Sequence, residues 1–265
     1  MKAVDDEQVA LQVWPCLDGN YTYALSREGR AVVIDPGAAE PVLDGLARLN
    51  ARLEAILATH GHDDHVAGIP RLAREFGCPV HGPPGAGIEG VTLPLRGGQD
   101  LDLGFCRFRI LATPGHTRHC LSLFEPDLRV LFCGDTLFVG GCGRPLECAP
   151  NELWDSLQTL AQLPDDTRVC CGHEYTVDNL RFALSVLPGD PHFLEAHASA
   201  VHLREKGLPT VPSTLAAEKR ANIFLRSAEP AVQSAVGLAG APAAEVFARL
   251  RHWKSEGKPL VRLSS

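Results

Sequence analysis

The segment from Thr59 to His65 places three imidazoles and two carboxylates within seven residues. Imidazole nitrogens and carboxylate oxygens are the ligands that zinc, iron and manganese accept in proteins. Alternate side chains of an extended segment share a face, so His60 and His62 can point to one metal ion. Asp64 and His65 follow one turn later and reach a different point in space. The spacing therefore favours two adjacent metal ions over a single ion.

Three further ligand-type residues come directly after apolar, strand-like runs, and each lies beside a glycine or a Pro-Gly pair. They are His116, Asp135 and His173. Loops at strand ends are where a rigid sheet usually presents functional side chains. A purely structural role for the whole group is disfavoured, because so many ionisable side chains are costly to crowd together without partners. We therefore predict that these residues join the first cluster in one metal site.

The elements that must position these residues follow from hydrophobic periodicity. Strands are expected over residues 9–14, 21–26, 31–34, 53–58, 78–81, 91–93, 105–112, 121–124, 130–133 and 168–171. Helices are expected over 41–49, 66–76 and 152–163, and then over 179–187, 192–206, 215–221 and 243–254. No strand-like alternation is apparent after about residue 176. The pattern predicts a mixed α/β metal domain over residues 1–176 and a smaller helical domain over residues 177–265.

Composition narrows the class of protein. The chain has 265 residues, of which 45% are hydrophobic and 22% charged, as in an ordinary globular protein. Its net charge of −7 argues against nucleic-acid binding. No apolar run approaches the ~20 residues of a membrane span, and residues 1–10 lack the apolar core of a signal peptide. The nine cysteines form no Cys-x-x-Cys pair and fit a reducing compartment. We expect a cytoplasmic monomer with no nucleic-acid or membrane partner.

The pattern His60-x-His62-x-Asp64-His65, followed by the three later ligand-type residues, resembles the ligand set of the metallo-β-lactamase superfamily. Within this superfamily the chain is most similar to the hydroxyacylglutathione hydrolases, or glyoxalase II family. The segments that carry the closer resemblance are 134–138, 141–144, 171–176, 212–215 and 222–226. The resemblance covers essentially the whole chain, including the helical C-terminal part.

The resemblance implies an αββα metallo-β-lactamase-type sandwich followed by a smaller C-terminal α-helical domain. It also implies two divalent metal ions, zinc with iron or manganese as alternatives. One ion would be held by His60, His62 and His116. The other would be held by Asp64, His65 and His173, with Asp135 bridging the two.

The reaction implied by the resemblance is hydrolysis of S-D-lactoylglutathione, and of other S-2-hydroxyacylglutathiones, to glutathione and a 2-hydroxy acid such as D-lactate. This is the second step of methylglyoxal detoxification. The nucleophile would be a hydroxide bridging the metal ions, with Asp64 and Asp135 as the catalytic carboxylates. A thiolate leaving group, with a reference pKa of about 8.5, needs no strong acid.

The resemblance also assigns four residues to glutathione: Arg144, Tyr175, Arg251 and Lys254. Arg251 and Lys254 would bind the glycine carboxylate, and their spacing puts them on one helix face. Several positions depart from the family pattern and affect the expected glutathione affinity and acyl preference. They are Leu146 in place of a tyrosine, the one-residue-short segment 116–119, Ser122 in place of an aromatic residue, and the segment 257–259. Asp63 matches no ligand, and we expect it to face solvent or to support the ligands from behind.

Three other functions remain open from the sequence. A lactonase or a β-lactamase of the same superfamily is one, although zinc β-lactamases of the common type carry cysteine where Asp135 stands. A glutathione persulfide dioxygenase with one iron is another, although it lacks the long helical C-terminal domain. A metal-stabilised binding module is the third, although a structural zinc site is normally closed by four ligands.

Overall fold

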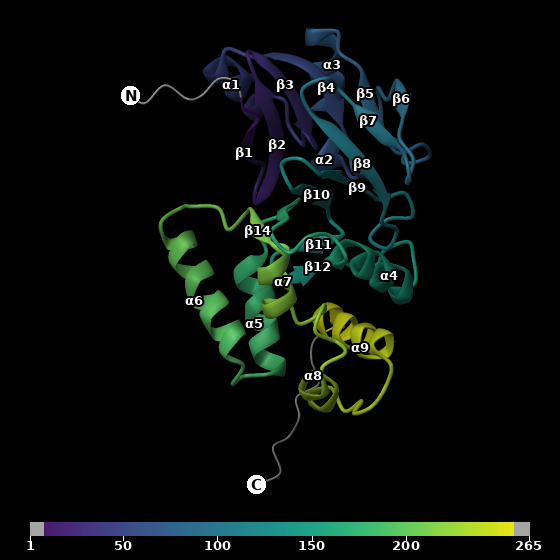
Figure 1. Ribbon diagram of the computed structural model, residues 1–265, viewed down its shortest axis with the longest axis vertical. Coiled ribbons are helices and arrows are strands. Elements are labelled where there is room, and N and C mark those ends of the chain that lie inside the picture. Colours follow the sequence, from purple (N-terminus) through teal and green to yellow (C-terminus); the bar gives the residue numbers. More distant parts are fainter. Residues whose placement is uncertain (1–7, 257–265) are drawn as a thin grey trace.

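The computed structural model describes residues 8–256, which form two six-stranded sheets and a mostly helical C-terminal part (Figure 1). The first sheet runs in sequence order through β1 (Ala10–Cys16), β2 (Asn20–Arg27), β3 (Arg30–Ile34), β4 (Arg52–Leu57), β5 (Val80–Gly82) and β6 (Leu93–Pro94). Helix α1 (Glu40–Leu49) connects β3 to β4, and helices α2 (Asp63–Val66) and α3 (Ile69–Phe76) connect β4 to β5.

The second sheet has the order β14-β13-β10-β9-β8-β7. Its strands are β7 (Asp100–Asp102), β8 (Arg107–Ala112), β9 (Leu121–Glu125), β10 (Val130–Gly134), β13 (Arg168–Cys171) and β14 (Ser213–Thr214). A small hairpin, β11 (Leu137–Phe138) and β12 (Gly141–Cys142), and helix α4 (Pro150–Ala161) lie between β10 and β13 in the chain. The remaining helices are α5 (Thr176–Val186), α6 (Pro191–Glu205), α7 (Leu215–Ala221), α8 (Pro230–Ala235) and α9 (Ala243–Glu256).

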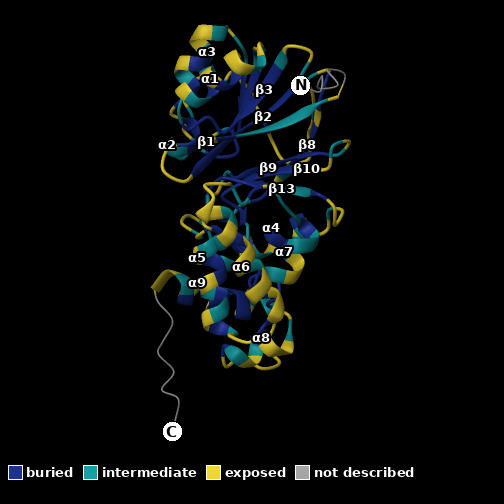
Figure 2. Cartoon of the chain, turned by 90° about the vertical axis from the view of Figure 1, so that its left-hand side faces the viewer, coloured by how far each residue is buried: buried dark blue, intermediate teal, exposed yellow. Residues whose placement is uncertain are grey.

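Strands β2 and β3 of the first sheet are buried on both faces, which explains their continuous apolar runs. Along β3, Val32 and Ile34 pack into the core between the sheets, whereas Ala31 and Val33 pack toward the outer helices. Figure 2 shows the resulting layers, with α1 and α3 outside the first sheet and α4 and α7 beyond the second. The predicted αββα sandwich followed by helices is confirmed.

Strand direction decides where the loops meet. Strands β3 and β4 are parallel, as are β10 and β13, and β8 runs in the same direction as β10 because both are antiparallel to β9. Parallel strands end at the same edge of a sheet. The residues that follow β3, β4, β8, β10 and β13 are therefore gathered at one edge of the sandwich.

The structure corrects several predicted elements. The expected helix over residues 66–76 is two helices, since the chain turns at Gly68, whose backbone NH donates to the carbonyl of Pro36. The C-terminal part contains a strand after all: β14 pairs with β13, so Ser213 opposes Val169. The short elements β7, β11, β12 and α8 were not predicted, because two or three residues of sheet and a six-residue helix have too little periodicity to detect.

The C-terminal helices pack directly on the sandwich. The ring centroids of Trp154 in α4 and Phe247 in α9 are 5.5 Å apart, and those of Phe247 and Phe224 are 5.9 Å apart. Apolar residues of the C-terminal helices belong to the same buried core as the space between the sheets. None of the helices within residues 8–256 is long and apolar enough to cross a membrane.

Candidate metal centre

Three imidazoles meet at the edge where β4 and β8 end. Nε2 of His60 lies 3.1 Å from Nδ1 of His62, and Nε2 of His116 lies 3.0 Å from the same atom. Donor atoms around a tetrahedral zinc ion, with Zn–N bonds of about 2.0–2.1 Å, are separated by about 3.3 Å. The spacing of the three nitrogens is therefore close to that of ligands around one metal ion.

A second group lies beside the first. Nε2 of His65 is 3.4 Å from Nε2 of His173, and Oδ2 of Asp64 is 3.3 Å from that atom of His173. Asp64 and His65 come from α2, whereas His173 follows β13. The prediction that Asp64 and His65 reach a different point from His60 and His62 agrees with these positions. Asp63, between the two groups in sequence, is exposed, as expected.

Asp135 lies between the two groups. Its Oδ2 is 3.2 Å from Nε2 of His173 and 3.5 Å from Nε2 of His116. Its Oδ1 is 3.3 Å from Nε2 of His65, close enough for an ion pair, yet it is buried and makes no geometrically satisfactory hydrogen bond to any described residue. A buried carboxylate oxygen facing imidazole nitrogens is costly without a cation. This donor set fits two divalent metal ions of the zinc, iron or manganese type.

Hydrogen bonds behind the ligands fix which nitrogen of each ring faces the centre. Nδ1 of His65 donates to Oδ2 of Asp35 at 3.1 Å. Oγ1 of Thr59 donates to Oδ2 of Asp35 at 2.6 Å and so accepts from Nδ1 of His60 at 3.0 Å. Nδ1 of His116 donates to the carbonyl of Arg144 at 2.8 Å. The Nε2 atoms of His60, His65 and His116 are thereby left to bind a metal ion.

The electrostatics of the cluster keep its carboxylates ionised. Burial raises the pKa of Asp135, but the neighbouring His65 and His173 outweigh that effect and hold the pKa well below its usual range. Burial lowers the pKa of His173, but hydrogen bonds to Asp135 and Asp64 outweigh it and raise the pKa to about 9. Asn20 donates to Oδ2 of Asp64 at 2.9 Å and helps to orient it. Asp64 and Asp135 are therefore anionic and available to cations at neutral pH.

Gly172 leaves room for this arrangement. A Cβ atom at residue 172 would lie 2.3 Å from Oδ1 of Asp135 and 2.5 Å from Cε1 of His65. These distances are far below van der Waals contact, so any side chain there would displace two members of the cluster. The glycine before His173 is thus required by the packing of the site.

A cavity of about 570 Å³ opens next to the cluster, and its lining includes all four residues predicted to bind glutathione: Arg144, Tyr175, Arg251 and Lys254. The ring of Tyr175 stacks on that of His173, with centroids 4.7 Å apart and planes within 7°. Tyr175 therefore separates the cavity from His173 of the cluster, and residues of α9 also line the cavity. Arg181 from α5 also lines it, so four cationic side chains face this space in an acidic protein.

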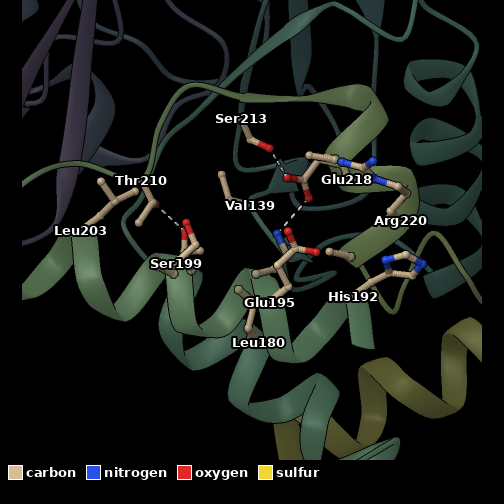
Figure 3. A pocket seen from close by; sticks show the side chains of 16 residues that line it. Val139, Leu180, His192, Glu195, Ser199, Leu203, Thr210, Ser213, Glu218 and Arg220 are labelled. Carbon is tan, nitrogen blue, oxygen red and sulfur yellow. Dashed lines mark hydrogen bonds between the residues drawn. The ribbon is translucent and has the colours of Figure 1, made fainter. Parts of the chain in front are cut away.

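The β11–β12 hairpin, which borders this cavity through Phe138 and Cys142, is held by the C-terminal part of the chain. Nδ2 of the fully buried Asn222 donates to the carbonyls of Phe138 at 3.2 Å and Gly141 at 2.8 Å. Oε2 of the buried Glu218 accepts from the backbone NH of Gly140 at 2.8 Å. Figure 3 shows Ser213 and Glu218 pointing toward one another in a second cavity, of about 260 Å³, which is also lined by Val139 and Gly140 of the hairpin.

Sequence reasoning did not identify Asp35, Asn20, Arg181 or Asp178 as site residues. Asp35 had a detectable signal, because it follows the buried strand β3 and precedes Pro36 and Gly37, the layout shared by the predicted ligands. The other three had none, since isolated polar residues at turns and on helix faces are common.

The comparisons with known proteins agree with this geometry. Residues 17–173 match the model of the metallo-beta-lactamase superfamily, and residues 174–256 match that of the hydroxyacylglutathione hydrolase C-terminus. Hydroxyacylglutathione hydrolase of Rhodopseudomonas palustris (strain BisB18) is 45% identical over 251 residues, covering 93% of this chain and 98% of the relative. The enzyme of the same name from Synechococcus sp. (strain JA-3-3Ab) is 44% identical over 247 residues, covering 91% and 97%.

Among solved structures, ETHE1 from Myxococcus xanthus superposes with a TM-score of 0.64 at 26% identity, covering 94% of this chain and all of that one (100%). The match of both family models, in order and over nearly the whole described chain, extends the likeness beyond the metal domain. This chain belongs to the metallo-β-lactamase superfamily and, within it, to the hydroxyacylglutathione hydrolases.

Proposed function

We propose that this protein hydrolyses S-D-lactoylglutathione and other S-2-hydroxyacylglutathiones to glutathione and the free 2-hydroxy acid, the second step of methylglyoxal detoxification. The observation that carries the proposal is a two-group metal-ligand cluster that lies, across the Tyr175 ring stacked on His173, beside a cavity lined by four cationic side chains. Glutathione is a net anion, and the cavity has the complementary charge. The curated relatives have the same activity in their names.

We assign the metal ligands according to the two groups. His60, His62 and His116 hold one ion, Asp64, His65 and His173 hold the other, and Asp135 contributes to both. When bound, the two ions supply a hydroxide nucleophile at neutral pH and a Lewis acid for the thioester carbonyl. Asp64 and Asp135 act as anionic ligands. Asp35 orients His65, Thr59 orients His60, and Asn20 orients Asp64.

The chain's own residues then bind and orient the thioester. Tyr175, 47% exposed and stacked on His173, forms the wall beside the reacting end, with Arg144 close to it. Arg251 and Lys254 lie on α9 at the other end of the cavity, where they attract the glycine carboxylate. Binding at that end positions the carbonyl at the cluster. The departing thiolate needs no strong acid, in agreement with its moderate basicity.

The alternative reading, a glutathione persulfide dioxygenase with one iron, is less supported. The second family model and the curated relatives all carry the name hydroxyacylglutathione hydrolase. The described structure also contains the C-terminal helices that the sequence analysis took as the distinguishing feature.

We also propose that the protein is a cytoplasmic monomer with no nucleic-acid partner, with a domain boundary near residue 176. All nine cysteines are free thiols, and seven of them are buried, which suits a reducing compartment. Light scattering at several protein concentrations tests the monomer, and expression of residues 1–176 alone tests the boundary.

The decisive experiment measures thiol release from S-D-lactoylglutathione together with metal content in the same sample. Rapid release with about two metals per chain is expected, and replacing the shared ligand by Asp135→Ala should lower turnover by several orders of magnitude. Arg251→Ala should raise KM more than it lowers kcat, because Arg251 acts at a remote carboxylate. Oxygen uptake with glutathione persulfide, one iron per chain and no thiol release would favour the dioxygenase instead.

A further inference from the structure

The charges that line the glutathione cavity are not all favourable to an anionic substrate. Asp178, in the first turn of α5, is the one carboxylate among the described lining residues, against Arg144, Arg181, Arg251 and Lys254. It pairs with Lys254: Nζ of Lys254 donates to Oδ2 of Asp178 and, at 3.1 Å, to its backbone carbonyl. The cation assigned to the substrate carboxylate is thus already paired within the protein.

The surroundings of Lys254 favour this pairing. The lysine side chain is only 16% exposed, and its ammonium lies 5.4 Å from the centre of the Phe182 ring. The Asp178 side chain is 67% exposed and lines the cavity. A substrate carboxylate that approaches Lys254 therefore meets a fixed negative charge next to its binding partner.

Arg251 differs from Lys254 in this respect. Its Nη1 donates to the carbonyl of Cys142 at 3.0 Å and its guanidinium lies over the ring of Phe224, and within residues 8–256 it forms no ion pair with a carboxylate. Its buried Nε has no hydrogen-bond partner among the described residues. Of the two cations on α9 that line the cavity, Lys254 therefore has its charge offset by Asp178, whereas Arg251 does not.

We propose that Asp178 is a specificity-determining residue that competes with the glycine carboxylate of the substrate for Lys254 and so weakens the binding of glutathione thioesters. This inference rests on the proposed function. It implies that the protein is tuned to a lower affinity than its cationic cavity would otherwise give. Removing the negative charge of Asp178 should tighten the binding of glutathione thioesters without altering the metal cluster where the thioester reacts.

The test replaces Asp178 by its uncharged isostere, Asp178→Asn. The expected result is a KM for S-D-lactoylglutathione lowered by about three- to tenfold, the order of effect of one partly exposed like charge. The dissociation constant of glutathione, measured by calorimetry, should fall in parallel. The difference should shrink as salt is added, because the charges near the mouth are screened. Asp165→Asn is the matched control, since Asp165 forms an exposed ion pair with Lys219 outside the cavity lining.

A second variant separates charge competition from a change in shape. Lys254→Met keeps the apolar stem and leaves Asp178 unpaired, so KM should rise by about tenfold or more. The double variant Asp178→Asn/Lys254→Met removes both charges, and its KM should return toward that of the unsubstituted chain. A thioester of glutathione with an amidated glycine carboxylate should not respond to Asp178→Asn.

Equal KM values and equal glutathione affinities for the Asp178→Asn and Asp165→Asn variants would overturn the inference while leaving the hydrolase function intact. A response of the amidated substrate as large as that of S-D-lactoylglutathione would also overturn it. Failure of the unsubstituted chain to bind glutathione would overturn the inference, and failure to release thiol would separately overturn the proposed function.

Discussion

Oδ2 of Asp35 lies 3.1 Å from Nδ1 of His65, on the side of the ring that faces away from the metal cluster. The same oxygen accepts from Oγ1 of Thr59, and Oδ1 accepts from the backbone NH of Thr59 at 2.8 Å. One buried carboxylate thus orients His65 directly and His60 through Thr59. Asp35 also adopts a left-handed backbone conformation with φ of 51°, which costs a non-glycine residue energy and is typical of functional sites.

The substitution Asp35→Asn should lower metal affinity by about 10- to 100-fold, because both oxygens of Asp35 accept hydrogen bonds whereas the amide has only one acceptor oxygen. Titration of the metal-free protein with zinc, in competition with a chelator, measures the change. Asp63→Asn is the control, since Asp63 is exposed and lies within the same motif. Unchanged metal affinity in Asp35→Asn would show that the orientation of His60 and His65 does not depend on the Asp35 carboxylate.

The substitution Gly172→Ala should reduce metal content and lower kcat at least tenfold, because the new methyl group would overlap Asp135 and His65. It changes no ligand, so the loss would come from displacement alone. Metal analysis and steady-state kinetics measure the effect. Gly189→Ala serves as control, because a Cβ there meets nothing within 4 Å. Full metal content and full activity in Gly172→Ala would contradict the packing argument.

Asn222→Ala should destabilise the protein by about 3 kcal/mol, because the buried carbonyls of Phe138 and Gly141 both lose their donor. Urea unfolding, followed by circular dichroism, gives the free-energy change. Since the β11–β12 hairpin borders the cavity proposed to bind glutathione, KM should rise as well. Gln233→Ala is the comparison, as its side chain also donates to a backbone carbonyl, that of Ala241, from a partly exposed position. Equal stability losses would argue against a special role for the hairpin.

A pH effect is expected at the buried pair of Asp190 and Arg226, joined at 2.7 Å. Burial raises the pKa of Asp190, but Arg226 and the backbone NH groups at the start of α6 outweigh it and lower the pKa. A carboxyl whose pKa is lower in the folded state stabilises the fold above its unfolded pKa of about 3.9. That stabilisation is lost as the pH falls through the folded value.

Asp190→Asn should therefore cost about 2 kcal/mol of unfolding free energy at pH 7, as expected for a hydrogen bond to a charged partner. The difference from the unsubstituted chain should shrink as the solution is acidified below about pH 4. Urea unfolding at a series of pH values measures it. Asp166→Asn, which breaks the exposed pair with Arg129, should have no measurable effect. A difference that stayed constant down to pH 2 would point to lost helix capping rather than lost charge.

Much of the fold could be predicted from local patterns. Long periodic elements such as β3, β4, α4 and α9 were recognised, since each carries enough apolar positions to show its period. The hairpin β11–β12 could not, because two residues in each strand show no period, and the edge strand β14 could not, because its partner β13 is distant in the sequence. The sequence predicts that the C-terminal part is purely helical, whereas in the structure Ser213 pairs with Val169 in the second sheet.

The sequence by itself determined the kind of chemistry and the residues available for it. Three imidazoles and two carboxylates in one loop, with His116, Asp135 and His173 after later strands, already implied two metal ions. Only the tertiary structure decided which nitrogen of His65 and His116 faces inward, because the parallel strands β3 and β4 bring Asp35 to His65 and the segment after the β11–β12 hairpin brings the carbonyl of Arg144 to His116. The pairing of Lys254 with Asp178, 76 residues apart in the chain, was also decided only by the tertiary structure, because α5 and α9 line the same cavity.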